Sequence, residues 1–357
     1  MKKISYSQVI ILLFIIRILK TMTFNPFINT SSVILMLAVL ASTLFQGLLF
    51  VPVAYIYKCC PGKDVNELAY GVSKAFGICV SLIYKLYFLL AILRAVKHFT
   101  YFMVQMFPGV GGRIVISVAL LAVAGYGAYL GLESIARTSV FVGGILFVMF
   151  ALIITTTKGE LDFLNVNMIS ESPFKSFLSC FIQEIGMNSE IIAFAVLLPY
   201  IKSGIKKAFA GLLVLKLVVI ELIIFLYTAL FGDYMKEIIL PFFSAGAFSK
   251  TQFVERFDPV YMVVWTLCAV VGVSLSIFFA VRCGKNVFIK IKEKYLYFII
   301  TVLCMAVFVI FRVEISTIDR AFDRWINSLL TVVLTGILPL VTFLIYRKKA
   351  CRTGDKV

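Results

Sequence analysis

The chain has 357 residues, of which 62% are hydrophobic and only 15% are charged. Soluble proteins are about 45–50% apolar, so this composition leaves too little polar surface to cover a soluble globule of this length. The formal net charge of +16 at pH 7 would suggest a nucleic-acid partner in a soluble protein, but in a membrane protein it is expected in the cytoplasmic loops. We therefore expect a polytopic protein embedded in a lipid bilayer, with no nucleic-acid partner.

The sequence offers little for catalysis or metal binding. It contains a single histidine, His98, and imidazole is the group on which most metal sites and most acid–base catalysis near neutral pH depend. The eight cysteines form no CxxC pair and several lie in apolar runs, so we interpret them as small apolar side chains. We predict neither an enzyme nor a bound metal or cofactor.

Ten segments are long and apolar enough to cross a bilayer, which takes about 20 residues of helix. We place them at about residues 5–27, 32–57, 76–103, 114–130, 138–157, 181–201, 208–231, 259–281, 295–311 and 325–346. No stretch between them is long enough to bury a core of its own. We expect one all-α membrane domain over residues 1–357, with a short interfacial helix in the loop at 59–74.

An even number of spans puts both ends of this domain on one side of the membrane. The loops on that side hold roughly twice as many Lys and Arg residues as the opposite loops, which predicts that both ends and the basic tail at 347–357 are cytoplasmic. Ten spans divide into five plus five, and an odd number per half inverts the second half relative to the first. We predict inverted repeats at about 5–157 and 181–346. In such folds the first helix of each half is commonly interrupted and binds the ligand near the midplane.

The first span carries two cations, Arg17 and Lys20, three residues apart and hence on one helical face. Each would be costly at the bilayer centre unless it met an anion, a water-filled cavity or the interface. One interpretation is that they contact a polar ligand or take part in coupling. The other is that they snorkel outward or pair with Glu184 or Glu190.

The same span ends in a polar stretch. Pro26 removes a backbone hydrogen bond and disfavours helix at Asn25. We hypothesise an unwound segment in which Thr21, Thr23 and Asn25 bind the ligand. The alternative is that this helix simply ends early.

The sixth span contains the second expected interruption. Gly186 costs about 1 kcal/mol in a helix relative to Ala, and Asn188 and Ser189 offer side-chain hydrogen bonds that compete with the helix. We predict a break here, with Gly186, Met187, Asn188 and Ser189 contacting the ligand and Glu190 pairing with a cation or binding a proton. The alternative is an external helix terminus whose acidic side chains are merely solvated.

Polar or aromatic residues on other spans are further candidates. Tyr84 and Trp265 are candidate ligand contacts, with packing as the alternative interpretation for each. Lys85, Lys216 and Glu221 are candidates for coupling or charge pairing, because ionisable residues inside a membrane usually face a partner or a cavity.

Two segments resemble the endospore germination permeases, the B subunits of the nutrient germinant receptors of spore-forming bacteria. These segments are GLESIARTSVF at 131–141 and VERFDPVYMVVWTLCAVVGVSLS at 254–276. The matches extend, in order, to KISYSQ at 3–8, the glycine-to-glutamate segment at 186–190 and LLPY at 197–200. Together they run through the chain in register.

The resemblance implies a LeuT-like fold of the amino acid, polyamine and organocation permease superfamily. It implies a ligand-sensing subunit that acts with a larger A subunit and a C-subunit lipoprotein in the spore inner membrane. Such a subunit would bind a small nutrient, with an amino acid expected, and signal to these partners to trigger germination. The alternatives are a secondary transporter of amino acids or other organic solutes, coupled to protons or ions through Glu190 or Glu221, and a structural partner of a channel that binds no ligand.

Overall fold

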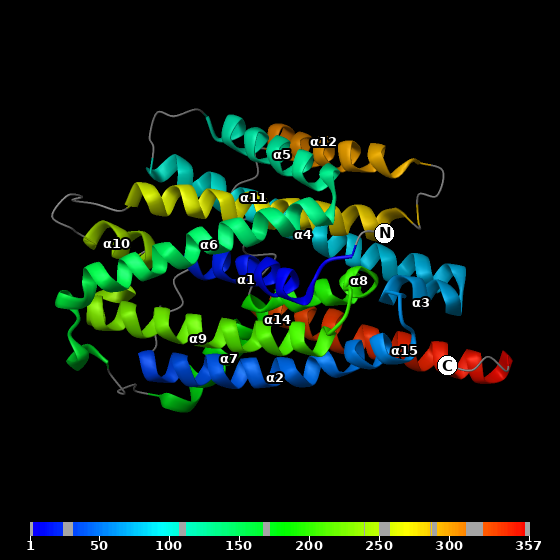
Figure 1. Ribbon diagram of the computed structural model, residues 1–357, viewed down its shortest axis with the longest axis horizontal. Coiled ribbons are helices and arrows are strands. Elements are labelled where there is room, and N and C mark those ends of the chain that lie inside the picture. Colours follow the sequence, from blue (N-terminus) through cyan, green and yellow to red (C-terminus); the bar gives the residue numbers. More distant parts are fainter. Residues whose placement is uncertain are drawn as a thin grey trace.

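The computed structural model describes residues 3–23, 31–106, 112–166, 172–238, 240–249, 258–285, 287, 291–311 and 324–353. In this part of the chain the secondary structure is helical, and ten helical segments are long and apolar enough to cross a membrane. The longest helices run side by side along one axis of the molecule (Figure 1). The predicted all-α membrane fold with ten spans is confirmed.

Eight of these spans are single helices. They are α1 (Tyr6–Thr23), α2 (Ser32–Cys59), α4 (Lys74–Met106), α5 (Arg113–Leu130), α6 (Leu132–Thr157), α9 (Ile205–Phe231), α11 (Asp258–Lys285) and α12 (Glu293–Phe311). Two are composite. The sixth comprises α7 (Pro173–Met187), η3 (Ser189–Ala193), α8 (Phe194–Leu197) and η4 (Leu198–Tyr200), and the tenth comprises α14 (Arg324–Val332), the π-helical η6 (Val333–Ile337) and α15 (Leu338–Thr353).

The connections contain shorter helices. They are α3 (Val65–Val72), η1 (Lys158–Glu160), η2 (Phe163–Asn165), η5 (Gly232–Lys236) and α10 (Pro241–Phe248). The helix α3 lies in the loop where a short interfacial helix is predicted, and it packs against α4 and α15. Helical turns also extend some spans beyond their apolar cores. The sixth span begins at Pro173 rather than near 181, and the fifth begins at Leu132.

The sixth span is interrupted where the sequence predicts it. The α-helix ends at Met187, and Asn188 leaves the helical region with φ −86° and ψ 27°. A 3-10 helix follows, so the backbone around Asn188 lacks the regular hydrogen bonds of an α-helix. The interruption lies deep in the protein, because Asn188 and Glu190 are both buried.

The first span differs from the prediction. Thr21 and Thr23 lie within α1, not in an unwound segment. Their hydroxyls donate to the carbonyls of Arg17 and Leu19, at 3.3 and 2.6 Å. This bonding four residues back is compatible with a helix, so the two hydroxyls do not interrupt α1. The predicted ligand contact Asn25 lies outside the described residues.

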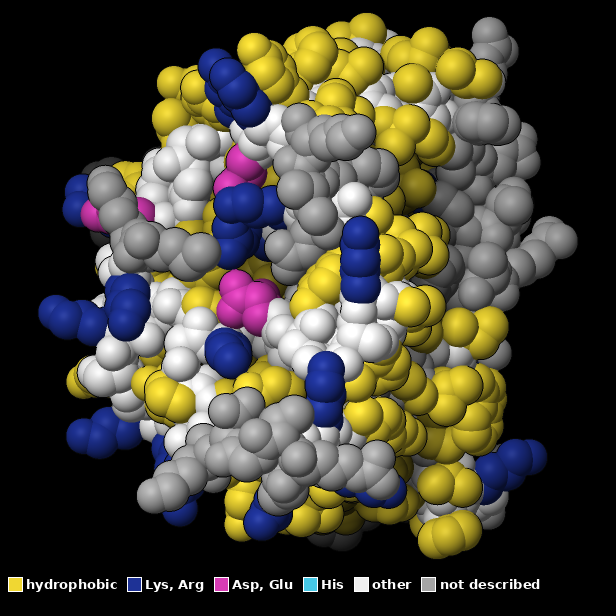
Figure 2. Space-filling view, turned by 90° about the vertical axis from the view of Figure 1, so that its right-hand side faces the viewer, with side chains coloured by type: hydrophobic (Ala, Val, Ile, Leu, Met, Phe, Trp, Pro, Cys, Tyr) yellow, Lys and Arg dark blue, Asp and Glu magenta, His cyan; other side chains and the backbone are white. Residues whose placement is uncertain are grey.

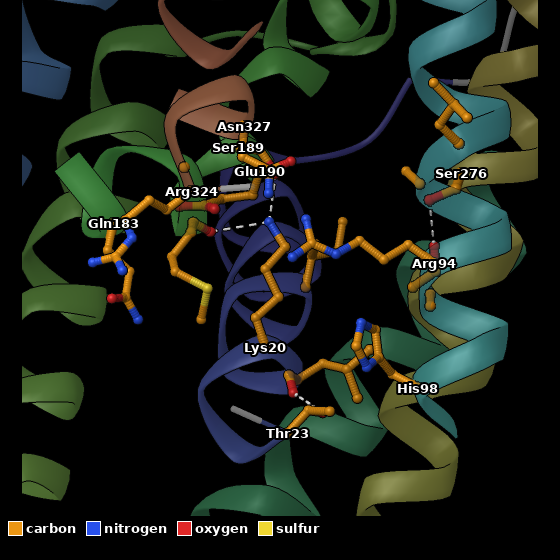
Figure 3. A pocket seen from close by; sticks show the side chains of 18 of the residues that line it. Lys20, Thr23, Arg94, His98, Gln183, Ser189, Glu190, Ser276, Arg324 and Asn327 are labelled. Carbon is orange, nitrogen blue, oxygen red and sulfur yellow. Dashed lines mark hydrogen bonds between the residues drawn. The ribbon is translucent and has the colours of Figure 1, made fainter. Parts of the chain in front are cut away.

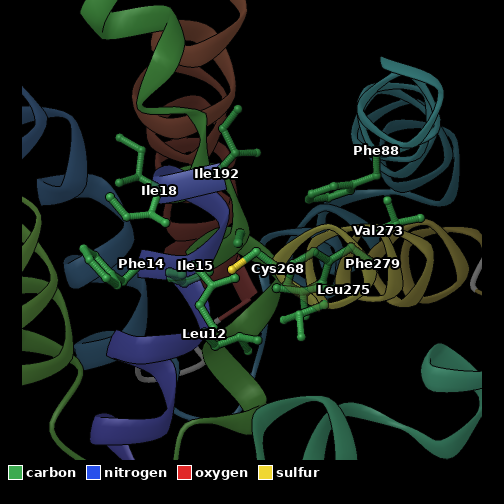
Figure 4. Packing of buried hydrophobic residues seen from close by; sticks show 14 of the residues in the cluster. Leu12, Phe14, Ile15, Ile18, Phe88, Ile192, Cys268, Val273, Leu275 and Phe279 are labelled. Carbon is green, nitrogen blue, oxygen red and sulfur yellow. The ribbon is translucent and has the colours of Figure 1, made fainter. Parts of the chain in front are cut away.

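The helix α1 occupies the centre of the bundle, where it packs against α6, α9 and α11. Its apolar side chains Leu12, Ile15 and Ile18 are fully buried, and they lie close to Ile192 of η3 and Cys268 of α11 (Figure 4). A helix surrounded by protein can carry polar side chains that would be costly against lipid. The position of α1 thus explains how Arg17 and Lys20 are accommodated.

The first span begins and the last span ends at the same end of the bundle (Figure 1). There, the backbone of Ile4 pairs with the end of the sixth span. Its N–H donates to the Tyr200 carbonyl at 2.8 Å, and its carbonyl accepts from the Lys202 N–H at 3.0 Å. This end of the molecule displays many Lys and Arg side chains (Figure 2).

Candidate functional site

A cavity of about 770 Å³ lies beside the interruption of the sixth span. Side chains from α1, α4, α7, η3, α11 and α14 line it (Figure 3). Its lining includes Lys175 and Arg324, in the first turns of α7 and α14. Both helices start after an odd number of crossings, so the cavity reaches toward the end of the bundle opposite the chain ends.

Behind the cavity wall, Arg17 joins α1 to the sixth span. Its guanidinium forms a salt bridge with Glu184 at 2.6 Å, and both side chains are almost completely buried. It also donates to Asn188 Oδ1 at 3.0 Å and to Thr21 Oγ1 at 2.7 Å. Removing one partner of such a buried pair is strongly destabilising, because the remaining charge is buried away from water without a counter-charge. Arg17 therefore fixes the position of the interruption relative to α1.

A second buried cation, Lys216 of α9, approaches the interruption from another side. Its ammonium lies 3.3 Å from Glu190 Oε1 and 3.2 Å from Asn188 Oδ1, and it donates to Gln46 Oε1 of α2. Asn188 also contacts Ser42 of α2 at 3.5 Å. Asn188 thus accepts hydrogen bonds from both Arg17 of α1 and Lys216 of α9. These bonds link α1 and α9 to the end of α7, where the sixth span is broken.

Lys20 reaches the same interruption from within the cavity. Its ammonium donates to the Met187 carbonyl at 3.0 Å and to Ser189 Oγ at 2.5 Å. Met187 is the last residue of α7, so its carbonyl is one of those that a helix end leaves without a partner. In Figure 3, Lys20 extends from α1 into the space between α4 and α7.

Aromatic side chains form another part of the cavity lining. Trp265 of α11 stacks on Phe99 of α4, with ring centroids 4.8 Å apart. Its indole N–H donates to Thr23 Oγ1 at 3.1 Å, and the Tyr261 hydroxyl donates to the Met22 carbonyl at 3.2 Å. These two bonds attach the end of α1 to α11, and the almost completely buried Trp265 forms part of the cavity wall.

The structure brings most of the predicted site residues together. The cavity is lined by Lys20, Thr23, Gly186, Met187, Ser189, Glu190 and Trp265. Thr21, Asn188, Lys216 and Arg17 lie directly behind this lining, in the hydrogen-bonded network around the interruption.

Three further candidates lie neither in the cavity lining nor among the residues directly behind it. The buried Tyr84 instead donates to the Leu334 carbonyl at 2.7 Å, in the π-helical turn of the tenth span. Lys85 lies beside Gly284, near the end of α11, where a Cβ would be 3.3 Å from its ammonium nitrogen. Glu221 is half-buried on α9. Packing against other helices, rather than ligand contact, accounts for the position of Tyr84.

Several cavity residues were not predicted as site residues. Arg94 and His98 of α4 both point into the cavity, as do Gln183, Arg324 and Asn327 (Figure 3). Tyr87, Ala91, Arg94 and His98 recur at intervals of four, three and four, which is the spacing of one helical face. That spacing is the signal from which the sequence could have predicted them. The described residues contain no group of three or more His, Cys, Asp or Glu side chains that could hold a metal.

Comparison with known proteins identifies the family. The family described as spore germination protein matches residues 3–320, which is nearly the whole chain. This chain belongs to the spore germination protein family. No curated protein sequence matches the chain significantly.

Solved structures show the same fold in transporters. A sodium-coupled sialic acid symporter in an outward-open state matches with a TM-score of 0.63 and 12% identity, over 96% of this chain and 78% of the symporter. A nucleobase-cation-symport-1 family transporter in a closed conformation, with bromovinylhydantoin bound, matches with a TM-score of 0.64 and 10% identity, over 98% of this chain and 94% of the transporter. This spore germination protein therefore has the LeuT-like fold, as predicted.

Proposed function

We propose that this protein is the membrane subunit of a spore nutrient germinant receptor and binds a small nutrient in the cavity beside Asn188. The observation that carries the proposal is the position of the cavity at the interruption of the sixth span, in a chain of the spore germination family. A ligand there would contact α1, the broken span and α11 at once. Binding would then favour one arrangement of these helices over another, which is the way a ligand shifts a conformational equilibrium.

The proposal includes partners and a location. The resemblance described above implies an A subunit and a C-subunit lipoprotein in the spore inner membrane. We further propose that the end of the bundle shown in Figure 2 is cytoplasmic, because its exposed side chains include Lys58, Lys63, Lys206 and Lys294. The cavity would then face the exterior of the membrane, the side from which a nutrient arrives.

A secondary transporter is the second candidate function, and Glu190 favours it. Glu190 is among the residues at the cavity wall, and its buried carboxylate is paired with the buried Lys216. A proton or cation that competes with Lys216 for Glu190 would alter the network at the interruption, which is a route to ion coupling.

Reconstitution separates the two candidates. The purified chain in lipid vesicles is tested for binding and for uptake of labelled amino acids, nucleosides and sugars. The receptor proposal predicts saturable binding without net uptake. Saturable uptake that follows an ion gradient would instead establish a transporter.

A genetic test addresses the signal. In a spore-former without a second copy of this gene, deletion is expected to abolish germination in response to the nutrient that binds. Normal nutrient-triggered germination in the deleted strain would contradict the receptor proposal.

A further inference from the structure

The ammonium of Lys216 lies in a cage of side-chain oxygens inside the protein. It donates to Gln46 Oε1 of α2, and it lies 3.2 Å from Asn188 Oδ1 and 3.3 Å from Glu190 Oε1. A lysine ammonium has three N–H donors and no acceptor, so these three oxygens satisfy all of its donors. The cage therefore holds one positive charge with a complete set of hydrogen bonds.

Water has almost no access to this cage. The lysine and the three side chains around it are each at most 2% exposed. A buried carboxylate without a cation is costly, so Glu190 requires a positive charge at this point, whether or not that charge belongs to the chain. Lys216 supplies it from α9, on the far side of the interruption from α11.

The cage lies where a transporter with broken helices would hold an exchangeable ion. In such folds the unwound backbone and the ends of the half-helices coordinate the coupling ion. Here Asn188 and Glu190 belong to the interruption itself, and the Met187 carbonyl at the end of α7 accepts a hydrogen bond from the Lys20 ammonium. Ammonium groups of the chain therefore contact the oxygens that the break exposes.

Two further polar atoms border the cage. Glu190 Oε2 and Gln46 Nε2 are buried, and neither has a hydrogen-bond partner among the residues that the structure describes. The second oxygen of the carboxylate is thus an unused ligand atom beside the ammonium. Carboxylate and amide oxygens are the ligands that hard cations take in proteins. Without the Lys216 side chain, the cage would offer a free cation both oxygens of Glu190 and two amide oxygens.

We propose that Gln46, Asn188 and Glu190 form a monovalent cation site, and that Lys216 fills this site permanently with its own ammonium. The cation at the interruption is consequently tethered and does not exchange with sodium or potassium. A charge that never leaves its site cannot transmit the energy of an ion gradient. The inference goes beyond the proposed function, and it narrows the second candidate function, because it excludes sodium or potassium coupling through Glu190 and retains proton coupling.

Removal of the tether tests the site. In Lys216→Ala, the buried Glu190 loses its counter-charge while the oxygens of the cage remain, so the variant should bind a small cation from solution. Thermal unfolding of the purified full-length protein in detergent is followed while ammonium chloride replaces choline chloride at constant ionic strength. We expect the melting temperature of Lys216→Ala to rise by about 2 °C or more over about 1–200 mM ammonium, because the cation binds the folded state.

Two control variants separate the cage from general salt effects. Lys206→Ala removes an exposed lysine at the start of the same helix and is expected to show no response to ammonium. The double variant Lys216→Ala with Glu190→Gln also removes the carboxylate and is expected to lose the response. If Lys216→Ala responds no more than Lys206→Ala, or if the double variant responds as strongly as Lys216→Ala, the inference is overturned.

The wild-type protein provides a test that does not depend on the folding of Lys216→Ala. Because Lys216 fills the site, the wild-type melting temperature is expected to be the same in sodium, potassium and choline chloride at equal ionic strength. A rise specific to sodium or potassium that Glu190→Gln abolishes would show that these ions enter the cage, and would overturn the inference. These measurements use no nutrient and no partner subunit, so their outcome is independent of the receptor proposal.

Discussion

Arg17 and Lys20 illustrate how neighbouring residues of the same charge acquire different roles. They lie three residues apart on α1, yet the first is almost completely buried against Glu184 and the second is half-buried in a cavity. The difference follows from what faces each side chain across the interruption. Arg17 meets a carboxylate and an amide, whereas Lys20 meets a helix-terminal carbonyl and a hydroxyl. These contacts give Arg17 a structural role, whereas Lys20 lines the cavity and stays a candidate ligand contact.

Glu184→Gln tests the structural role of the first pair. The substitution leaves the Arg17 guanidinium buried without a counter-charge, so we expect a loss of about 3–5 kcal/mol of stability. Glu133→Gln is the matched control, because Glu133 pairs with Arg137 at a site where the arginine side chain is 72% exposed. There we expect a loss below about 1 kcal/mol.

Thermal unfolding of the purified variants in detergent gives the comparison. The double variant Arg17→Met with Glu184→Met removes both charges and is expected to be more stable than Glu184→Gln alone. Equal melting temperatures for Glu184→Gln and Glu133→Gln would show that the buried pair does not hold the interruption in place.

The types of residue in the sixth span were enough to predict its interruption. They were not enough to predict which face of a helix lines the cavity. Arg17, Asn188 and Glu190 were recognisable because polar groups in an apolar span require partners. Tyr84 was not separable from Tyr87 by residue type, yet Tyr87 lines the cavity and Tyr84 bonds to the tenth span. The packing of α4 against α11 decides which face of α4 meets the cavity. A single sequence does not show which helices pack together.

At the scale of helices, the two composite spans approach each other closely beside the interruption. A Cβ at Gly186 would lie 3.0 Å from Asn327 Cβ and 3.2 Å from the backbone nitrogen of Ser328. The Ser328 hydroxyl, in turn, donates to the Ile182 carbonyl of α7. Glycine at this position therefore lets α14 lie directly against α7, in addition to any role in weakening the helix.

Gly186→Leu should push α14 away from α7 and lower stability by about 1–3 kcal/mol, the usual cost of overpacking. Gly144→Leu on α6 is the control, because a Cβ there meets no atom within 4 Å and the position is exposed. Melting temperatures of the two variants, together with their ligand affinities, measure the effect. Indistinguishable values would mean that the contact between α7 and α14 is unimportant.

The short helix α3 provides a pH-dependent element at the bundle end that contains the chain ends. Asp64 caps it, accepting from the Glu67 N–H at 2.7 Å, and Glu67 accepts from the Asp64 N–H at 3.2 Å. Burial of Asp64, reinforced by the nearby Glu67 carboxylate, raises the pKa of the Asp64 carboxyl from 3.8 to about 7. The folded protein therefore binds a proton at Asp64 more tightly than the unfolded chain does.

The sign of the pH dependence follows from this difference. Asp64 stabilises the folded state most below about pH 4, and this contribution falls as the pH rises to about 7, by up to about 1.4 kcal/mol per pH unit. Above about pH 7 it is constant. Asp64→Asn keeps the capping oxygen and removes the titration. Between about pH 4.5 and 7 the unfolding free energy of the wild type is expected to fall relative to that of Asp64→Asn, and above about pH 7 the difference is expected to stay constant. Parallel curves, or a wild type that gains stability relative to the variant, would exclude this titration of Asp64.

At the scale of the whole molecule, the apolar pattern alone was enough to predict ten spans, because a bilayer imposes one length and one composition on every crossing. The pairing of the spans was not predictable in the same way. The central position of α1 results from contacts with α6, α9 and α11, which are distant in sequence. The cavity is likewise formed by six elements, and the sequence of any one of them does not show which others line the cavity with it.

The orientation of the molecule decides which compartment the cavity samples, and α9 offers a direct test. Lys207 lies exposed at its start and Tyr234 is 67% exposed in η5 just beyond its end, so the two positions are on opposite sides of one crossing. In a variant without native cysteines, a membrane-impermeant maleimide should label Tyr234→Cys in intact cells and Lys207→Cys only after permeabilisation. Because η5 and the start of α7 both follow an odd number of crossings, this pattern puts the cavity mouth outside. The reverse pattern would place the mouth in the cytoplasm and remove the route by which an external nutrient reaches Lys20.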